Sequence, residues 1–262
     1  MIYRTDIFEE GRLNPFTGQV FDASWIVFIL TDSKEYQQFV GASKECAYTV
    51  KTSRLKHADW KMAAGDFISC NQAQGKHIIL VMSKLEMLEV EKYYTGHSYN
   101  EASLRDSEPS VLIHSTPMSN WLKIKKDGML KSWNRLKQEN AVREIQPIGT
   151  QLGDPIEFSD YIMFGGGVTG EIVVHSKQQG KIIMDENAAY VTGARLYFDA
   201  KKMAQDGLLI RDGCHLKVKD QLPLSPYLIW SATWNVLGLN EQVSTPRIFS
   251  RLADQRFHQL YG

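Results

Sequence analysis

The first hundred residues alternate between continuously apolar runs and polar stretches. The runs WIVFIL (25–30) and KHIILVM (76–82) have the pattern of strands that are buried on both faces. A polar stretch follows each run: DSKEYQQFV (32–40) predicts a helix that begins at an Asp or Ser cap, and SKLEMLEVEKYY (83–94) predicts a second helix. We therefore expect this half of the chain to be α/β or α+β.

The helix predicted over 83–94 has an apolar side. Leu85 and Leu88 lie three residues apart, and either Tyr93 or Tyr94 continues their side of the helix. We expect these side chains to pack on the core of the first half.

A polar segment of mixed charge, HSYNEASLRDSEPS (97–110), separates two parts of different texture. It ends in a proline–serine pair, which is typical of a linker or loop. The sequence therefore predicts an N-terminal α/β region over 1–100 and a second domain over 108–262.

The second part begins with a strand and a helix. VLIH (111–114) predicts the strand, and SNWLKIKKDG (119–128) predicts the helix, with Ser119 as its cap and Gly128 as its stop. Three short β-rich runs follow: EIVVHS (171–176), KIIMD (181–185) and ARLYFD (194–199).

The remaining pattern is that of short elements joined by tight turns. AKKMAQDG (200–207) predicts a short helix with a terminal glycine, and LLIRDGCHLKV (208–218) predicts a hairpin that turns at Asp212–Gly213. Many short strands with a few small helices favour an α+β domain on a split or curved antiparallel sheet.

Composition narrows the function classes. Hydrophobic residues make up 43% and charged residues 23% of the 262 positions, as in ordinary globular proteins. Lys plus Arg and Asp plus Glu are both 30, so no global positive field holds nucleic acid by charge alone. Cys46, Cys70 and Cys214 lack CxxC spacing, and the seven histidines lack zinc-site spacing, which argues against a disulfide framework or a metal centre.

Two features predict a cytoplasmic protein. The N-terminal stretch MIYRTDIFEEGRLN is charged and has no apolar core of a signal peptide. The longest apolar runs are much shorter than the roughly 20 residues that a membrane span needs.

The best candidate for chemistry is His114, at the end of the strand predicted over 111–114. A single histidine beside apolar residues is more often structural than catalytic. Here, however, the strand end, a loop and a helix start meet near one point, where backbone groups can grip an amide and the imidazole can bind a ribose hydroxyl.

The stretch 111–130 resembles the first motif of the ADP-ribosyltransferase fold, in the branch of poly(ADP-ribose) polymerases and RNA 2′-phosphotransferases. The matching residues are His114, Ser115, Thr116, Asn120, Ile124, Gly128, Met129 and Leu130. The family usually has glycine where this chain has Ser115, whose backbone has less room around it.

A second segment, 194–228, resembles the C-terminal part of the RNA 2′-phosphotransferases. The matching residues, in order, are Asp199, Ala200, Met203, Asp206, Gly207, Arg211, Pro223, Tyr227 and Leu228. The hairpin is shorter here than in the family. The resemblance covers about 110–230 and does not extend to the first hundred residues.

The resemblance implies transfer of ADP-ribose from NAD, with release of nicotinamide, to an RNA 2′-phosphate or another phosphorylated nucleic-acid acceptor. His114, Arg211 and His215 are the expected catalytic residues. Tyr161 would stack on the nicotinamide and Ser159 would contact ribose or phosphate. The full set expected to hold NAD is His114, Ser115, Thr116, Ser159, Tyr161 and Arg195.

Two alternatives remain open. The chain would be a non-catalytic module that binds NAD or an RNA end, or a toxin-like transferase that modifies a protein or a DNA base. No glutamate lies in the predicted hairpin, which favours phosphate handling, although Glu171 and Glu186 keep glutamate-type transfer in play. A Cys214–His215 thiol nucleophile is disfavoured, because adjacent residues of a strand point to opposite faces.

Overall fold

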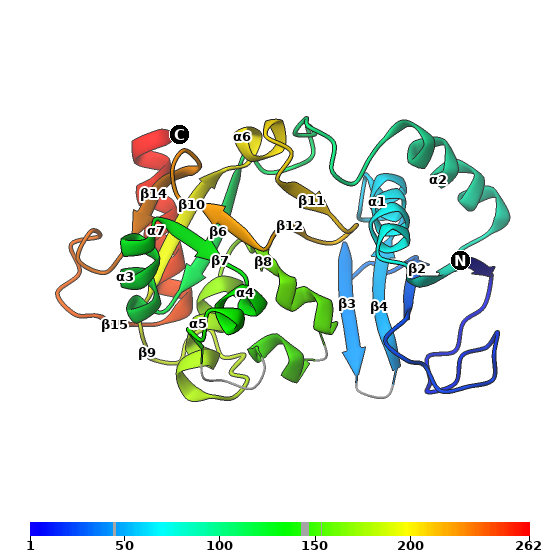
Figure 1. Ribbon diagram of the computed structural model, residues 1–262, viewed down its shortest axis with the longest axis horizontal. Helices are drawn as coiled ribbons and strands as arrows, with labels where there is room; N and C mark the ends of the chain where they lie inside the picture. Colours follow the sequence, from blue (N-terminus) through cyan, green and yellow to red (C-terminus); the bar gives the residue numbers. More distant parts are fainter. Residues whose placement is uncertain (44–45, 143–146, 153) are drawn as a thin grey trace. The chain divides into compact units, whose positions relative to one another are not determined.

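A computed structural model of the protein (Figure 1) describes residues 1–43, 46–142, 147–152 and 154–262. The chain divides into two compact units. Unit 1 comprises Met1–Glu101, Leu152–Ile156 and Leu209–Leu216; unit 2 comprises Ala102–Gln151, Glu157–Leu208 and Lys217–Gly262. The first boundary lies inside the polar segment predicted as a linker. Two later segments nevertheless belong to unit 1, which a single domain over 108–262 does not anticipate.

Unit 1 is built on a five-stranded sheet. Its strands are β1 (Ile2–Thr5), β2 (Trp25–Thr31), β3 (Gln38–Ser43), β4 (Cys46–Ser53) and β5 (His77–Val81). They lie in the order β1-β5-β2-β4-β3; all neighbours are parallel except β3, which runs antiparallel to β4. The predictions of β2 and β5 are confirmed.

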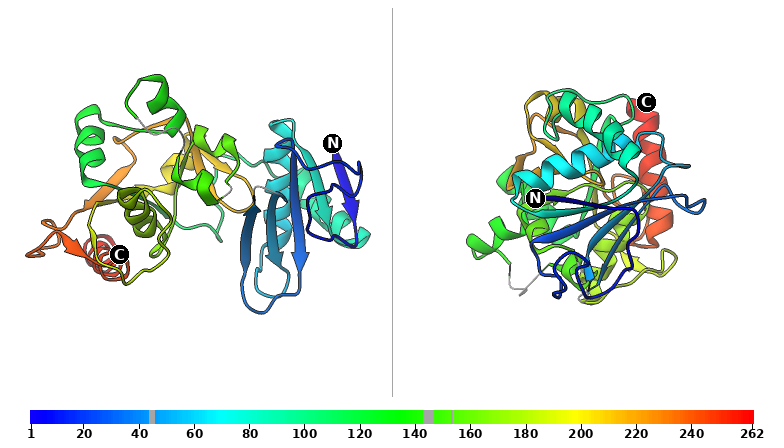
Figure 2. Two further views of the ribbon diagram at one scale, coloured as in Figure 1. Left: turned by 90° about the horizontal axis from the view of Figure 1, so that it is seen from below. Right: turned by 90° about the vertical axis from the view of Figure 1, so that its right-hand side faces the viewer.

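Both faces of this sheet are covered, which explains the unbroken apolar runs of its central strands. The helices α1 (Trp60–Ala73) and α2 (Lys84–Gly96) pack together on one side (Figure 2), where Phe28 meets Phe67 with 5.3 Å between ring centroids. On the other side, Phe8 and Phe21 from the segment after β1 pack on a cluster that includes Val27.

Two predictions in unit 1 are wrong. Residues 32–40 form no helix; the chain enters β3 at Gln38 instead, because pairing with β4 satisfies its backbone. Helix α2 does begin at a Ser83 cap, but Leu85 and Leu88 are exposed, as is Tyr93. Its buried residue is Val90, and Tyr94, the other tyrosine named, is half-buried and lies against Gly65 of α1. The apolar spacing therefore identified the helix, but the two leucines do not lie on its inner side.

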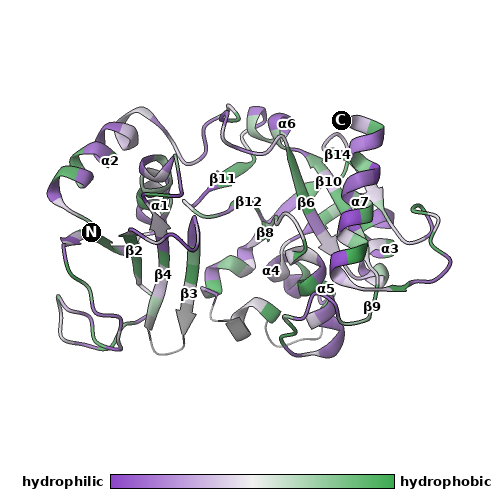
Figure 3. Cartoon of the chain, turned by 180° about the vertical axis from the view of Figure 1, so that it is seen from behind, coloured by the Kyte–Doolittle hydropathy of each residue, from purple (hydrophilic) through white to green (hydrophobic). Residues whose placement is uncertain are grey.

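Unit 2 has a three-stranded antiparallel sheet in the order β14-β10-β6. Its strands are β6 (Val111–Thr116), β10 (Ala194–Asp199) and β14 (Leu228–Ala232). The last helix, α7 (Pro246–Tyr261), packs on this sheet through Phe257, whose ring stacks on Tyr197 at 4.4 Å. Figure 3 shows both hydrophobic and hydrophilic stretches on α7, as expected of a helix with one face on a core.

Shorter elements complete the fold. They are α3 (Met118–Asp127), β7 (Met129–Lys131), α4 (Trp133–Gln138), η1 (Ile148–Leu152), η2 (Ile156–Asp160), β8 (Tyr161–Met163), α5 (Thr169–Gln179), β9 (Tyr190–Val191), α6 (Ala200–Gln205), β11 (Leu209–Arg211), β12 (Leu216–Lys219), β13 (Gln221–Pro223) and β15 (Val243–Ser244). Strand β12 pairs with β8, β13 with β7, and β15 with β9. The mixed α+β class is thus confirmed.

The helix stops predicted for unit 2 are confirmed, whereas two strands are not. Gly128 ends α3 with φ +65° and Gly207 follows α6 with φ +70°, in the left-handed region that glycine favours. Residues 171–176 lie in helix α5, which buries Glu171, Val174 and His175 on one side, and 181–185 form no strand. β-branched residues in the helical segment suggested a strand that tertiary packing overrides.

Two further outcomes concern single features. Ser119 lies inside α3, whose cap is Pro117, because the helix begins two residues earlier than a cap at Ser119 would place it. Within the described residues, no helix is both long and apolar enough to cross a membrane.

Candidate functional site

His114 lies in β6 and is held from one side. Its Nδ1 is 3.0 Å from the carbonyl oxygen of Met163, at the end of β8, and the Phe164 ring meets it edge-on with 6.3 Å between centroids. A carbonyl oxygen can only accept, so Nδ1 carries the hydrogen. The second nitrogen, Nε2, then presents a lone pair.

The charge state of His114 follows from its surroundings. Burial, with a smaller contribution from Lys177, lowers the pKa of His114 to about 4, although the hydrogen bond to Met163 acts in the opposite direction. The imidazole is therefore neutral near pH 7. A neutral ring with Nδ1 engaged offers Nε2 as an acceptor to a hydroxyl.

Ser115 and Thr116 are enclosed where β6 ends. A Cβ on Gly170 would lie 2.6 Å from Ser115 Oγ, and a Cβ on Gly193 would lie 2.1 Å from the Thr116 carbonyl oxygen. Only glycine fits at both positions. Both Ser115 and Thr116 are buried, so the neighbouring elements cover the very backbone that was expected to grip nicotinamide.

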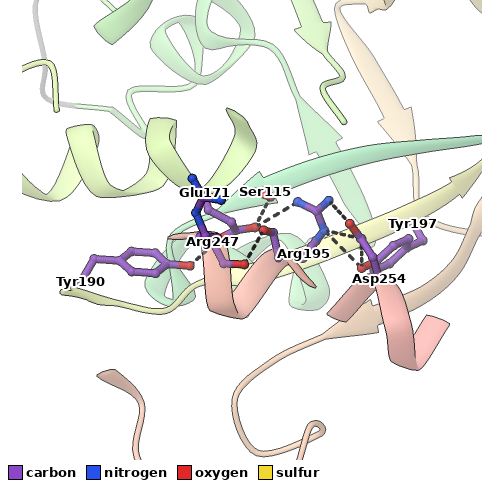
Figure 4. A network of polar contacts seen from close by, with 8 residues as sticks. Ser115, Glu171, Tyr190, Arg195, Tyr197, Arg247 and Asp254 are labelled. Atoms are coloured by element: carbon purple, nitrogen blue, oxygen red, sulfur yellow. Dashed lines mark hydrogen bonds and ion pairs between the residues drawn. The ribbon is translucent and has the colours of Figure 1, made fainter. Parts of the chain in front are cut away.

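A buried polar network lies directly behind Ser115 (Figure 4). Ser115 Oγ donates to Glu171 Oε1 at 2.5 Å, and the Tyr190 hydroxyl donates to Glu171 Oε2 at 2.7 Å. Arg195 NH1 lies 3.5 Å from Glu171 Oε1. Burial raises the pKa of Glu171, against the lowering effects of Ser115, Arg195 and Tyr190. Glu171 is thus a core residue of α5, and it is not exposed to a substrate.

The same network fully engages Arg195. Its Nε and NH2 donate to the two carboxylate oxygens of Asp254 at 2.9 and 3.0 Å, and Nε also lies 3.2 Å from the Tyr197 hydroxyl. The Arg195 side chain has no exposed surface. The expectation that Arg195 binds NAD finds no support in these contacts, because its guanidinium is buried and pairs with Asp254 and Glu171.

Tyr161 has a different neighbour from the one predicted. The ammonium of Lys217, itself buried, lies 4.5 Å from the centroids of both the Tyr161 and Phe158 rings. The Tyr161 ring thus packs on a cation of its own chain, where a nicotinamide was expected. Ser159 is buried in η2, and its hydroxyl has no hydrogen-bond partner among the described residues.

Arg211 and His215 belong to unit 1, whereas His114 belongs to unit 2. Arg211 is buried; its backbone N–H donates to the Tyr99 carbonyl at 2.8 Å, and its NH1 donates to the Glu101 carbonyl at 3.1 Å. The guanidinium ties β11 to the end of the N-terminal segment, which does not support the predicted grip on phosphate.

The predicted turn at Asp212–Gly213 is present and extends to His215. Asp212 N–H donates to the His215 carbonyl at 3.2 Å, and the Asp212 carboxylate accepts from the backbone N–H groups of Cys214 and His215 at 3.0 and 2.7 Å. Cys214 and His215 are therefore turn residues. The alternation of strand side chains therefore does not apply to them, and the objection to that pair based on strand alternation lapses.

The residues that carry the second resemblance have local structural roles. The Asp199 side chain caps α6 by accepting from Lys202 N–H at 2.9 Å. The Tyr227 hydroxyl donates to Asp206 Oδ2 at 2.7 Å, which fixes the end of α6 to the start of β14. Asp199, Asp206 and Tyr227 thus have structural roles that need no ligand.

The sequence analysis missed the partner of Arg195. Asp254 follows Arg195 by 59 residues, so no spacing rule connects them. One signal was available: Asp254 lies beside the buried positions Ala253 and Phe257 of an amphipathic helix, where a carboxylate needs a partner.

Comparison with known proteins adds no relative. No family model, no curated protein and no solved structure matches this chain. Among the residues that the structure describes, no group of three or more His, Cys, Asp or Glu side chains is arranged to hold a metal ion.

Proposed function

We propose that unit 2 is an ADP-ribosyltransferase-like domain that binds NAD and transfers ADP-ribose to an acceptor, releasing nicotinamide. The acceptor to be tested first is an RNA 2′-phosphate or another phosphorylated nucleic-acid end. The motif 111–130 supports this proposal, since its strand, loop and glycine-terminated helix all form in β6 and α3.

One observation carries the proposal: the hydrogen bond between His114 Nδ1 and the Met163 carbonyl oxygen. The Nδ1–H group is fixed on that carbonyl, and the ring stays neutral, so Nε2 is an acceptor for a ribose hydroxyl. Among the described residues, the hydrogen bond of the imidazole is the one through Nδ1. The side chain is half-buried in β6, two residues before the strand ends at Thr116.

A second candidate function, NAD binding without reaction, is favoured by the positions of the other charged groups. Arg211 is engaged with backbone carbonyls in unit 1, and Glu171 is buried against Ser115. Neither offers a charge to the reacting ribose, which an oxocarbenium-like transition state needs.

Nicotinamide release from NAD by the full chain tests the proposal, with and without a 2′-phosphorylated oligonucleotide. His114→Asn keeps a donor for the Met163 carbonyl and removes Nε2, whereas His114→Gln places an amide near the Nε2 position. We expect oligonucleotide-dependent release that is lost in His114→Asn and partly retained in His114→Gln.

Each other outcome selects a different conclusion. Release without the oligonucleotide would indicate a hydrolase or a transferase with another acceptor, including the toxin-like class. NAD binding by calorimetry without release would establish the non-catalytic module. Equal release by both variants and the parent chain would contradict the role of His114.

A further inference from the structure

Helix α3 of unit 2, labelled in Figure 1, presents a group of lysines without partners of opposite charge. Lys123, Lys125 and Lys126 are all exposed. Among the residues that the structure describes, none of the three forms an ion pair or a hydrogen bond through its side chain. The next cations along the chain differ, since Lys131 and Arg135 both pair with Glu139.

The sequence concentrates positive charge in this part of unit 2. Residues 118–139 contain six lysines or arginines and two carboxylates, whereas the whole chain has 30 residues of each sign. The balanced total therefore conceals a local excess of positive charge. Such an excess can hold an anionic strand even though the protein as a whole carries no net charge.

The stability of the helix accounts for only part of this charge. Lys125 and Lys126 lie in the last turn of α3, where a positive charge interacts favourably with the helix dipole. Lys123 lies one turn earlier, three residues before Lys126, and like charges at this spacing repel each other. Asp127 lies four residues after Lys123, but its ion pair is with Lys131, at 3.9 Å. The helix thus keeps a positive side that its own stability does not require.

The same helix is held firmly at both ends. The Pro117 carbonyl accepts from the N–H groups of Asn120 and Trp121, both at 3.0 Å. Trp121 is 5% exposed, so the side of α3 opposite Lys123 and Lys126 packs on unit 2. Beyond the helix end at Gly128, β7 pairs with β13. The lysines are therefore presented in a fixed arrangement.

We propose that the lysine face of α3, formed by Lys123, Lys125 and Lys126, binds the phosphate backbone of a single-stranded RNA acceptor. The identity of the strand rests on the proposed function. Strand β6, which carries His114, is joined to α3 by Pro117 alone. The proposed site and the lysine face thus belong to one strand–helix unit. Contacts to phosphates supply affinity and register without reading the sequence of the RNA.

The chemistry of α3 favours a nucleic-acid strand over an anionic membrane. A helix that lies on a membrane buries an apolar side in the lipid. The apolar side of α3 is already used, because Trp121 packs within the protein. Its outward side carries Ser119 and Asn120 beside the lysines, with Leu122 as its exposed large apolar residue. Lysine ammonium groups on a polar surface suit phosphates, which they contact as point charges.

The salt dependence of RNA binding tests the lysine face. The full chain is titrated into a fluorescein-labelled single-stranded RNA without NAD, and affinity is measured by anisotropy between about 50 and 200 mM KCl. Each lysine–phosphate contact adds about 0.7 to the slope of log affinity against log salt for a single strand. Lys123→Gln/Lys126→Gln should therefore flatten the slope by about 1.4. Over this range the parent chain should lose about seven-fold more affinity than the variant.

Lys84→Gln/Lys201→Gln is the matched control. It removes the same charge from α2 and α6, at two exposed lysines that also form no ion pair among the described residues. Glutamine keeps a helix propensity close to that of lysine, so all three chains should unfold at similar temperatures. The control should keep the slope of the parent chain. Equal flattening by both pairs would overturn the lysine face, because binding would then follow net charge alone.

Two further measurements separate the remaining outcomes. Vesicles that contain phosphatidylserine should not sediment with the parent chain. Sedimentation that Lys123→Gln/Lys126→Gln abolishes, without RNA binding, would assign the face to a membrane and overturn the proposal. Nicotinamide release is assayed separately: salt-dependent RNA binding without release would contradict the proposed reaction and support the lysine face. Release that depends on His114, with no difference in RNA binding between the parent chain and the lysine variant, would overturn the lysine face alone.

Discussion

The surroundings of His114 and of His215 differ in one decisive group. Both side chains are half-buried and both engage Nδ1, but His114 faces the Met163 carbonyl and His215 faces the Asp212 carboxylate. Burial prevails at His114 and lowers its pKa to about 4; at His215 the carboxylate prevails and raises the pKa well above 6.5. A neutral acceptor does not offset the cost of burying an imidazolium, whereas a carboxylate does.

This difference bears on the proposed function. A neutral imidazole with a lone pair on Nε2 suits the binding of a ribose hydroxyl, whereas an imidazolium at His215 can only donate. The two sites are therefore expected to respond in opposite ways to pH and to charge-removing substitutions.

The largest expected loss of stability comes from removing the buried positive charge of Arg195. Arg195→Met would leave Glu171 buried without its cation and Asp254 without its bidentate partner. Because breaking a buried ion pair strands the remaining charge, we expect a loss of about 3–5 kcal/mol in the free energy of unfolding, measured by urea denaturation.

Arg247→Met is the matched control for that prediction. Arg247 pairs with Glu186, but its side chain is more than half exposed, so its loss should cost less than about 1 kcal/mol. Equal losses in the two variants would mean that the buried network contributes no more than a surface pair.

The next effect is the pH dependence that His114 confers. The folded-state pKa of His114 lies below the unfolded value. Its contribution to the free energy of unfolding is therefore fully present above about pH 6.5 and is lost as pH falls toward 4. At roughly 1.4 kcal/mol per unit, the loss approaches 3 kcal/mol. Unfolding free energies of the parent chain and His114→Asn between pH 4.5 and 7.5 measure it; parallel curves would argue that His114 is not buried neutral.

A smaller loss of stability is expected from Gly213→Ala, in the turn that carries His215. Gly213→Ala forces a Cβ against the Ala63 carbonyl oxygen at a positive φ, whereas Gly75 has a φ of +73° and open space around it. Gly75→Ala should therefore cost only about 1 kcal/mol of backbone strain, and Gly213→Ala about 2–3 kcal/mol. Thermal or urea unfolding measures the two losses of stability. Similar losses would show that the turn can move away from α1 at little cost.

The smallest effect on stability is expected from Asp212→Asn, at about 1 kcal/mol. The raised folded-state pKa of His215 means that its contribution is present below about pH 6.5 and is lost as pH rises through the folded value. The substitution should remove this slope and lower the midpoint of the His215 titration followed by NMR. An unchanged midpoint would show that Asp212 is not the group that keeps His215 charged.

Local rules predicted the parts of the fold that depend on neighbouring residues. The apolar runs located β2 and β5, and the glycines at 128 and 207 located two helix ends, since a positive φ is a property of one residue. The strand predicted over 171–176 failed because its β-branched residues lie on a helix whose packing side includes Glu171.

The candidate sites were predictable to different degrees. His114 was found because its motif is contiguous, whereas the pairing of Arg195 with Asp254 joins segments 59 residues apart and leaves no spacing signal. The cluster at Cys214 was within reach of the sequence. The Asp212–Gly213 signal predicted a turn, and a turn removes the strand alternation that seemed to separate Cys214 from His215.

The division of the chain also bears on how the protein can be dissected. Unit 1 draws on three separate stretches of sequence, so the chain passes from one unit to the other five times. Neither unit corresponds to a single fragment that one cleavage would release. A fragment that begins at residue 108 would keep the turn at 212–215 but would lack α1 and β3, which hold that turn. Folding of unit 1 is complete only after its last segment, 209–216, has been synthesised.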